Sequence, residues 1–250
     1  MIKDNYKSPN YNNRIDGSKI DYIIIHYTGV KAPSQNIIKW FLSPASKVSC
    51  HYFINNNGTI YSLVNDSLRA WHAGKSYWNG CRDINSQSIG IELHNSGLED
   101  FSSKQINSLL KLLELLISKH SIDRHNILGH SDVSVGRKID PGIRFPWQLL
   151  NKSGIGIYSE MESIKNNNTN SELADQIKPT IMSFQKKLIE IGFELSISGL
   201  IDEQTEKVVA AFQRHWRPEL VDGILDQNTR NIIVEIHRKI IAARSLKLEN

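Results

Sequence analysis

Tyr22-Ile23-Ile24-Ile25-His26 is a continuous apolar run that ends in a histidine. Its three consecutive β-branched side chains predict a strand that is buried on both faces. A second strand-like run, Ser88-Ile89-Gly90-Ile91, is followed by Glu92. Open α/β sheets place their sites at the carboxyl ends of strands, so His26 and Glu92 are the first candidates for a functional site.

Further strands and a helix surround these two runs. Residues 49–54 and 59–64 are strand-like and flank Asn55-Asn56-Asn57-Gly58, which is a strong turn signal. Residues 103–120 carry apolar side chains at helical spacing, and Ser102 or Ser103 is suited to cap that helix. This order predicts an α/β domain over residues 1–150, with a central mixed β-sheet flanked by helices.

The C-terminal part of the chain has a different pattern. Residues 151–178 lose the periodicity of the first part, contain many Asn, Ser and Gly, and are expected to form a linker. Within residues 179–245, the run from Gly199 to Thr205 recurs 24 residues later as the run from Gly223 to Thr229. In each copy Gly permits a turn and Asp caps the amphipathic helix that follows. With one preceding helix, these copies predict a small three-helix domain.

Composition narrows the class of partner and the location. The net charge of +4 comes without any dense Lys/Arg run, so nucleic acid is not expected as a partner. The longest apolar runs are far shorter than the ~20 residues that a membrane span needs. The first residues lack the apolar segment of a secretion signal, which leaves a cytoplasmic location open. Cys50 and Cys81 are too few for a disulfide framework, and the sequence leaves open whether they are bridged.

Three side chains form a candidate zinc site. His26 ends a buried strand, His130 lies in the turn Gly129-His130-Ser131-Asp132, and Asp140 precedes Pro141-Gly142. Two neutral imidazoles and one carboxylate leave an open position on zinc, which is the pattern of catalytic rather than structural sites. Taken singly, the histidines also suit hydrogen-bonded core positions and the aspartate an Asp-Pro-Gly turn. The three together favour the metal site.

Two further residues are candidates for catalysis beside that metal. If the strand alternates, Glu92 faces away from Ile91 and Leu93 and needs a partner, either a metal-bound water or a structural ion pair. Lys138 is two residues before Asp140, so both side chains point to the same side of an extended segment. Its ammonium could then stabilise an oxyanion. The alternative interpretation of Lys138 is a solvated surface lysine.

The ordered motifs resemble one family specifically. They are Ser8-Pro9-Asn10-Tyr11, Ile24-Ile25-His26-Tyr27-Thr28, Val48-Ser49-Cys50-His51-Tyr52, Trp71-His72-Ala73-Gly74, Ser88-Ile89-Gly90-Ile91-Glu92, Gly129-His130-Ser131-Asp132 and Arg137-Lys138-Ile139-Asp140-Pro141-Gly142. Over residues 8–150 the chain resembles the amidase-2 family of N-acetylmuramoyl-L-alanine amidases, whose fold group includes the peptidoglycan recognition proteins. The C-terminal repeat resembles a peptidoglycan-binding domain, and the pair resembles the AmiD-like branch.

The resemblance implies a role for each matching residue. His26, His130 and Asp140 would be the Zn²⁺ ligands, Glu92 the general base and Lys138 the residue that stabilises the transition state. Substrate contacts are expected from four further residues: Trp71, His72, His94 and Asn95. His51 is expected to be a core residue or a residue that supports the ligands rather than a ligand itself, and His120, His125, His215 and His237 are given no role in the chemistry.

The implied reaction is hydrolysis of the amide between the lactyl group of N-acetylmuramic acid and L-alanine, in peptidoglycan or muropeptides. The alternative is a recognition protein that binds wall fragments without cutting them, but the complete ligand set favours the enzyme. A wall-binding domain favours the cell envelope as the location. The sequence leaves open the oligomeric state, a preference for a 1,6-anhydro sugar or stem-peptide length, and a bacterial or phage origin.

Overall fold

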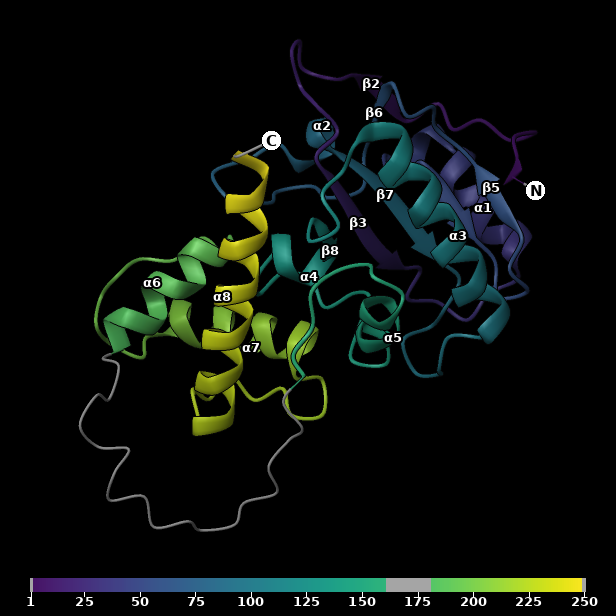
Figure 1. Ribbon diagram of the computed structural model, residues 1–250. Coiled ribbons are helices and arrows are strands. Elements are labelled where there is room, and N and C mark those ends of the chain that lie inside the picture. The colour runs from purple at the N-terminus through teal and green to yellow at the C-terminus, as the bar shows by residue number, and fades with distance from the viewer. Residues whose placement is uncertain (1, 161–180, 249–250) are drawn as a thin grey trace.

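The buried strand of the sequence lies inside a mixed sheet. The computed structural model describes residues 2–160 and 181–248. Its main sheet has the order β1-β5-β4-β7-β3-β8, and β3 and β7 lie next to each other within it (Figure 1). The strands of this sheet are β1 (Ile2–Lys3), β3 (Tyr22–Tyr27), β4 (Tyr52–Ile54), β5 (Ile60–Ser62), β7 (Ser88–Leu93) and β8 (Ile127–Gly129). A separate pair, β2 (Tyr11–Asn13) and β6 (Leu68–Ala70), is antiparallel.

Both faces of β3 are covered, as its apolar run predicts. Ile23 and Ile25 pack in a core cluster with the apolar face of α3 (Ser103–His120), whereas Ile24 packs in a second cluster on the other face. All three isoleucines are 0% exposed. Within this sheet β4 and β5 are antiparallel to each other, and the other neighbouring strands are paired in parallel. The predicted mixed sheet of an α/β fold is therefore confirmed.

Besides α3, the α/β part contains one helix of nine residues, α1 (Ser34–Leu42), and several shorter ones. Helix α1 packs beside Phe53 in a third apolar cluster, which also buries Cys50. The short helices are η1 (Pro44–Ser46), α2 (Ile84–Gln87), α4 (His130–Val133) and α5 (Trp147–Lys152). Cys50 and Cys81 are both free thiols.

The C-terminal repeat forms two equivalent turns. The helices are α6 (Ile181–Ile191), α7 (Glu203–Trp216) and α8 (Gln227–Leu248). Asp202 accepts a hydrogen bond from the Thr205 amide, and Asp226 accepts one from the Thr229 amide, each at 2.8 Å. A buried glutamine braces each turn, because Gln185 accepts from the Gly199 amide and Gln213 from the Gly223 amide. The predicted repeat is therefore a structural repeat.

The helical part and the α/β part contribute residues to the same apolar core. One apolar cluster joins Ile24 and Trp78 to Phe212 and Ile233. Of the expected linker, residues 151–160 are packed: α5 continues to Lys152, and Ile155 is 1% exposed. Ile155 packs in the same apolar cluster as the sheet residues Ile23 and Ile25. Residues 161–178 lie outside the described residues.

Among the described residues, we find no helix with the length and apolar character needed to cross a membrane.

Candidate metal centre and its cleft

The sheet brings the predicted site residues to one edge. His26 is the fifth residue of β3 and is paired in register with Glu92 of β7. On the other side of β3, Ile25 is paired with Gly129, the last residue of β8, so His130 follows immediately at the start of α4. Parallel strands end at the same edge, and this geometry places His26, Glu92 and His130 together.

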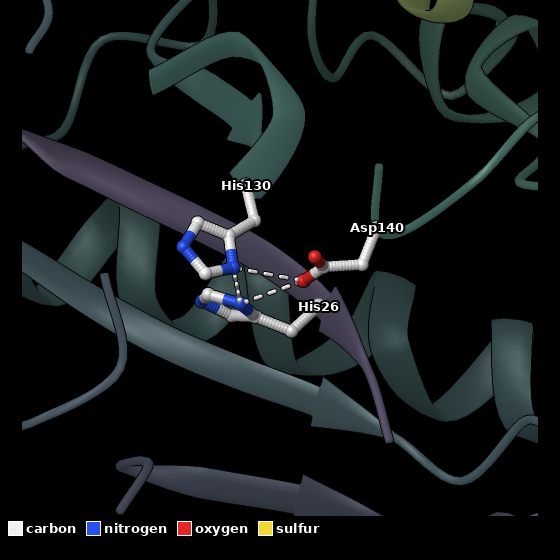
Figure 2. Close-up of side chains that lie close together, drawn as sticks. All are labelled: His26, His130 and Asp140. Carbon is white, nitrogen blue, oxygen red and sulfur yellow. Dashed lines mark hydrogen bonds and ion pairs between the residues drawn. The ribbon is translucent and has the colours of Figure 1, made fainter. Parts of the chain in front are cut away.

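Asp140 completes a compact triangle with the two histidines (Figure 2). His26 Nδ1, His130 Nδ1 and Asp140 Oδ2 are each 3.0 Å from the other two atoms. All three residues are buried. A tetrahedral zinc with bonds of about 2.0–2.1 Å separates its ligand atoms by about 3.3 Å, so the triangle has the dimensions of a zinc site.

The protonation of the triangle also suits a cation. His130 Nε2 is 3.1 Å from the Ala73 carbonyl oxygen, which only accepts, so His130 carries its hydrogen on Nε2 and a lone pair on Nδ1. Burial and the neighbouring His130 lower the pKa of His26 to about 4, so that ring is neutral. Burial alone would raise the pKa of Asp140, but the neighbouring His130 and His26 hold that pKa well below its usual range. Electron-pair donors therefore converge on one point, and the residues fit a divalent metal.

Glu92 is a half-buried residue beside this triangle, paired in register with His26. Its Oε2 is shielded from solvent and has no hydrogen-bond partner among the described residues. Burial, and then the charge of Asp140, raise the pKa of Glu92 to about 8, although Lys138 opposes the shift. An unpaired carboxyl group with a pKa near neutrality is typical of an acid or base in catalysis.

A cleft of about 720 Å³ opens over the triangle. It is lined by the three triangle residues and by Glu92, Lys138, Trp71 and His72. His94 and Asn95, also predicted to contact substrate, line a neighbouring cleft of about 520 Å³ instead. The side chain of Asn95 is 2% exposed and binds the Glu99 carbonyl and the Gly97 amide. The structure thus brings Trp71 and His72 to the cleft and places His94 and Asn95 beside it.

The cleft contains residues that the sequence did not single out. Trp40 of α1 lines it although its side chain is 57% exposed, and Arg137 lines it from the segment before Asp140. Arg137 also donates hydrogen bonds to the carbonyls of Ala73 and Lys75. The sequence signal that could have identified Trp40 is a large aromatic residue outside the apolar face of an amphipathic helix, which is formed by Ile37, Ile38 and Phe41.

Two family models match the chain. A model described as N-acetylmuramoyl-L-alanine amidase matches residues 16–143, and one described as a putative peptidoglycan binding domain matches residues 178–233. N-acetylmuramoyl-L-alanine amidase AmiD of Escherichia coli is 31% identical over 233 residues, covering 86% of this chain and 81% of AmiD. The 1,6-anhydro-N-acetylmuramyl-L-alanine amidase AmpD of Haemophilus influenzae is 34% identical over 160 residues, covering 57% of this chain and 86% of AmpD.

Solved structures resemble the chain over both of its parts. E. coli AmiD, in complex with the substrate anhydro-N-acetylmuramic acid-L-Ala-D-gamma-Glu-L-Lys, has a TM-score of 0.74 at 29% identity, covering 91% of this chain and 93% of AmiD. AmpDh3 from Pseudomonas aeruginosa has a TM-score of 0.74 at 28% identity, covering 92% and 96%. The likeness therefore includes the C-terminal helices as well as the sheet.

Proposed function

Because this chain belongs to the N-acetylmuramoyl-L-alanine amidase family, we propose that it is a zinc enzyme that cleaves the amide between the lactyl group of N-acetylmuramic acid and L-alanine. Its substrates would be peptidoglycan or muropeptides. The observation that carries the proposal is the triangle of His26, His130 and Asp140 in the lining of a cleft, with Glu92 beside it, whose shielded Oε2 has no partner among the described residues.

The triangle residues would hold the metal through His26 Nδ1, His130 Nδ1 and Asp140 Oδ2. When bound, zinc supplies Lewis acidity, which activates a water molecule and polarises a carbonyl oxygen. Burial and the charge of Asp140 favour the protonated form of Glu92, and a cation bound at the triangle would oppose both effects.

Glu92 would transfer protons in the reaction, and Lys138 would stabilise the negative charge that develops. Glu92 would take the proton of the attacking water and then deliver it to the departing nitrogen of L-alanine. Lys138 is exposed at the cleft, and its ammonium would stabilise the negative charge that develops on the lactyl carbonyl oxygen.

The C-terminal helices support a location at the cell envelope. Residues 178–233 match a peptidoglycan-binding model, and such a region concentrates an enzyme on an insoluble polymer. The AmiD complex contains an anhydro-muramyl peptide, so we propose muropeptides of this class as substrates here.

Mass spectrometry of muropeptides tests this function directly. Anhydro and reducing-end muropeptides are incubated with zinc-loaded protein, with chelator-stripped protein and with stripped protein to which zinc is restored. We expect release of free stem peptides with an L-alanine amino terminus only when zinc is present. Cleavage at another bond would overturn the substrate assignment. Intact muropeptides together with binding to isolated wall would identify a recognition protein instead.

A further inference from the structure

The short turn that carries His130 is closed by hydrogen bonds of its own backbone. The Gly129 amide donates to Asp132 Oδ2 at 2.7 Å, which closes the turn around His130. The Ser131 amide donates to the carbonyl oxygen of Asp140 at 2.9 Å. One turn therefore presents one residue of the triangle and holds the backbone of a second.

Asp132 is itself held from outside the turn by helix α7, which lies beside α4 (Figure 1). His215 Nδ1 is 2.7 Å from Asp132 Oδ2, the same oxygen that accepts from the Gly129 amide. His215 is 3% exposed and Asp132 1%, so the contact is shielded from bulk water. Asp132 Oδ1 has no hydrogen-bond partner among the described residues, so the contacts of Oδ2 orient the carboxyl group.

The ring of His215 has little freedom to turn away from Asp132. It is stacked between Trp147 and Trp216, with centroid distances of 3.8 and 3.9 Å and interplanar angles of 17° and 5°. Trp147 also lies against the turn, because a Cβ on Gly129 would be 3.3 Å from its Cζ2. The stack sets the plane of the His215 ring, and the contact with Asp132 sets the direction of Nδ1.

We propose that His215 is a positioning residue for the metal centre, which acts through Asp132 on the turn that presents His130 and holds Asp140. The inference rests on the proposed function in one respect, the presence of a metal at the triangle. It gives the C-terminal helices a task in the reaction besides attachment to the wall. Residues behind the ligands of a metal orient those ligands, and their loss weakens metal binding about 10–100-fold. His215 acts through one further residue, so the lower limit of this range is expected.

A packing role for His215 makes a different prediction, and Phe212 provides the comparison. Phe212 lies three residues earlier on α7 and is 0% exposed in the apolar cluster that joins the two parts of the chain. If His215 only helps the two parts to pack, Phe212→Ala should disturb the metal centre as much as a substitution of His215. If His215 positions the turn, zinc affinity should respond to His215 alone.

Two substitutions of His215 separate its polar contact from its stack. His215→Asn places an amide where Nδ1 lies and can keep a hydrogen bond with Asp132, whereas His215→Phe keeps a ring between the tryptophans and has no polar atom. Zinc affinity is measured by chelator competition at a temperature at which every variant is folded. We expect it to fall about tenfold in His215→Phe and to stay much closer to wild type in His215→Asn and Phe212→Ala.

Three results of this competition would overturn the proposal. Unchanged affinity in His215→Phe would show that the contact with Asp132 has no effect on the metal centre. Equal losses in His215→Phe and His215→Asn would assign the effect to the ring rather than to its polar atom. An equal loss in Phe212→Ala would reduce His215 to a packing role.

Hydrogen exchange in metal-free protein tests the same link without zinc. The Gly129 amide reports on the turn, and the Ile23 amide, which donates to the Asn126 carbonyl oxygen within the sheet, reports on unfolding of the core. We expect His215→Phe to accelerate exchange at Gly129 about tenfold more than at Ile23. Equal acceleration at both amides, or none at Gly129, would overturn the inference. Failure of the wild-type protein to take up zinc would reject the proposed metal, while the exchange rates would still decide whether His215 holds the turn.

Discussion

Individual side chains at the cleft differ in what their removal should change. In the proposed function Glu92 would be the proton acceptor and His130 a metal ligand, although both line the same cleft. We expect Glu92→Gln, which keeps the shape of the side chain, to lower turnover about 10²–10⁴-fold while zinc content stays at one per chain. His130→Ala should lose both zinc and turnover. The measurements are steady-state rates on a muropeptide and metal content by mass spectrometry. Full activity in Glu92→Gln would show that another group is the base.

A second residue-scale prediction concerns stability rather than chemistry. Asp66 is 6% exposed and accepts hydrogen bonds from Tyr52, Lys119 and His120. Burial alone would raise the pKa of Asp66, but hydrogen bonds from Lys119, His120 and Tyr52 lower it. Because the folded pKa lies below that of the unfolded chain, this stabilisation is complete above about pH 4 and is lost as the pH falls through the folded pKa.

Replacing that carboxylate should therefore matter only where it is ionised. We expect Asp66→Asn to lower the free energy of unfolding by about 1–3 kcal/mol at neutral pH. The difference from wild type should shrink as the pH falls below about 4. Urea unfolding of both proteins at several pH values measures this difference. A gap that stays constant down to acid pH would mean that packing, and not charge, explains the effect.

Among the elements, α3 has the clearest local stop and start signals. Ser102 accepts a hydrogen bond from the Gln105 amide at 3.1 Å, and Ser121 follows the helix with a left-handed backbone, φ 54°. Of the two serines that the sequence offers as caps, the structure selects Ser102. We expect Ser102→Ala to destabilise the protein by about 1 kcal/mol.

Ser103→Ala is the matched control for this cap. Ser103 is the first residue of α3 and is exposed, so its replacement should change the free energy of unfolding by less than about 0.5 kcal/mol. Thermal or urea unfolding of both variants measures the difference. Equal effects of the two substitutions would locate the cap elsewhere.

At the scale of the whole molecule, the C-terminal helices are part of the structure that supports the cleft. His215 of α7 lies 2.7 Å from Asp132, which in turn accepts from the Gly129 amide just before His130. The His215 ring is stacked between Trp147 and Trp216, with centroid distances of 3.8 and 3.9 Å. The two parts therefore share polar and aromatic contacts as well as an apolar core, next to a candidate metal ligand.

This shared core predicts that the two parts unfold together. Phe212 is 0% exposed in the cluster that joins them, so we expect Phe212→Ala to cost about 3–5 kcal/mol and to move a single calorimetric transition downward. Val234→Ala, at a 42% exposed position on α8, is the control and should barely move it. Two separate transitions, with only one shifted by Phe212→Ala, would contradict this cooperativity.

The sequence by itself determined what depends on local periodicity and on residue type. The isoleucine run at Ile23–Ile25, the apolar face of residues 103–120 and the paired Gly and Asp turns each predicted an element that the structure contains. The motifs around His26, His130 and Asp140 were sufficient to identify the family and the candidate ligands, because metal chemistry restricts the residue types that can serve.

Only the tertiary structure decided which side chains meet across long sequence distances. His72 and His26 are 46 residues apart, and His215 and Asp132 are 83 apart, so neither contact leaves a local pattern in the sequence. Residues 151–160 had the composition of a linker, yet Ile155 is buried in the core of the sheet. Hydrogen-bond partners and burial depend on which surfaces fold against one another. The composition of a single segment does not contain that information.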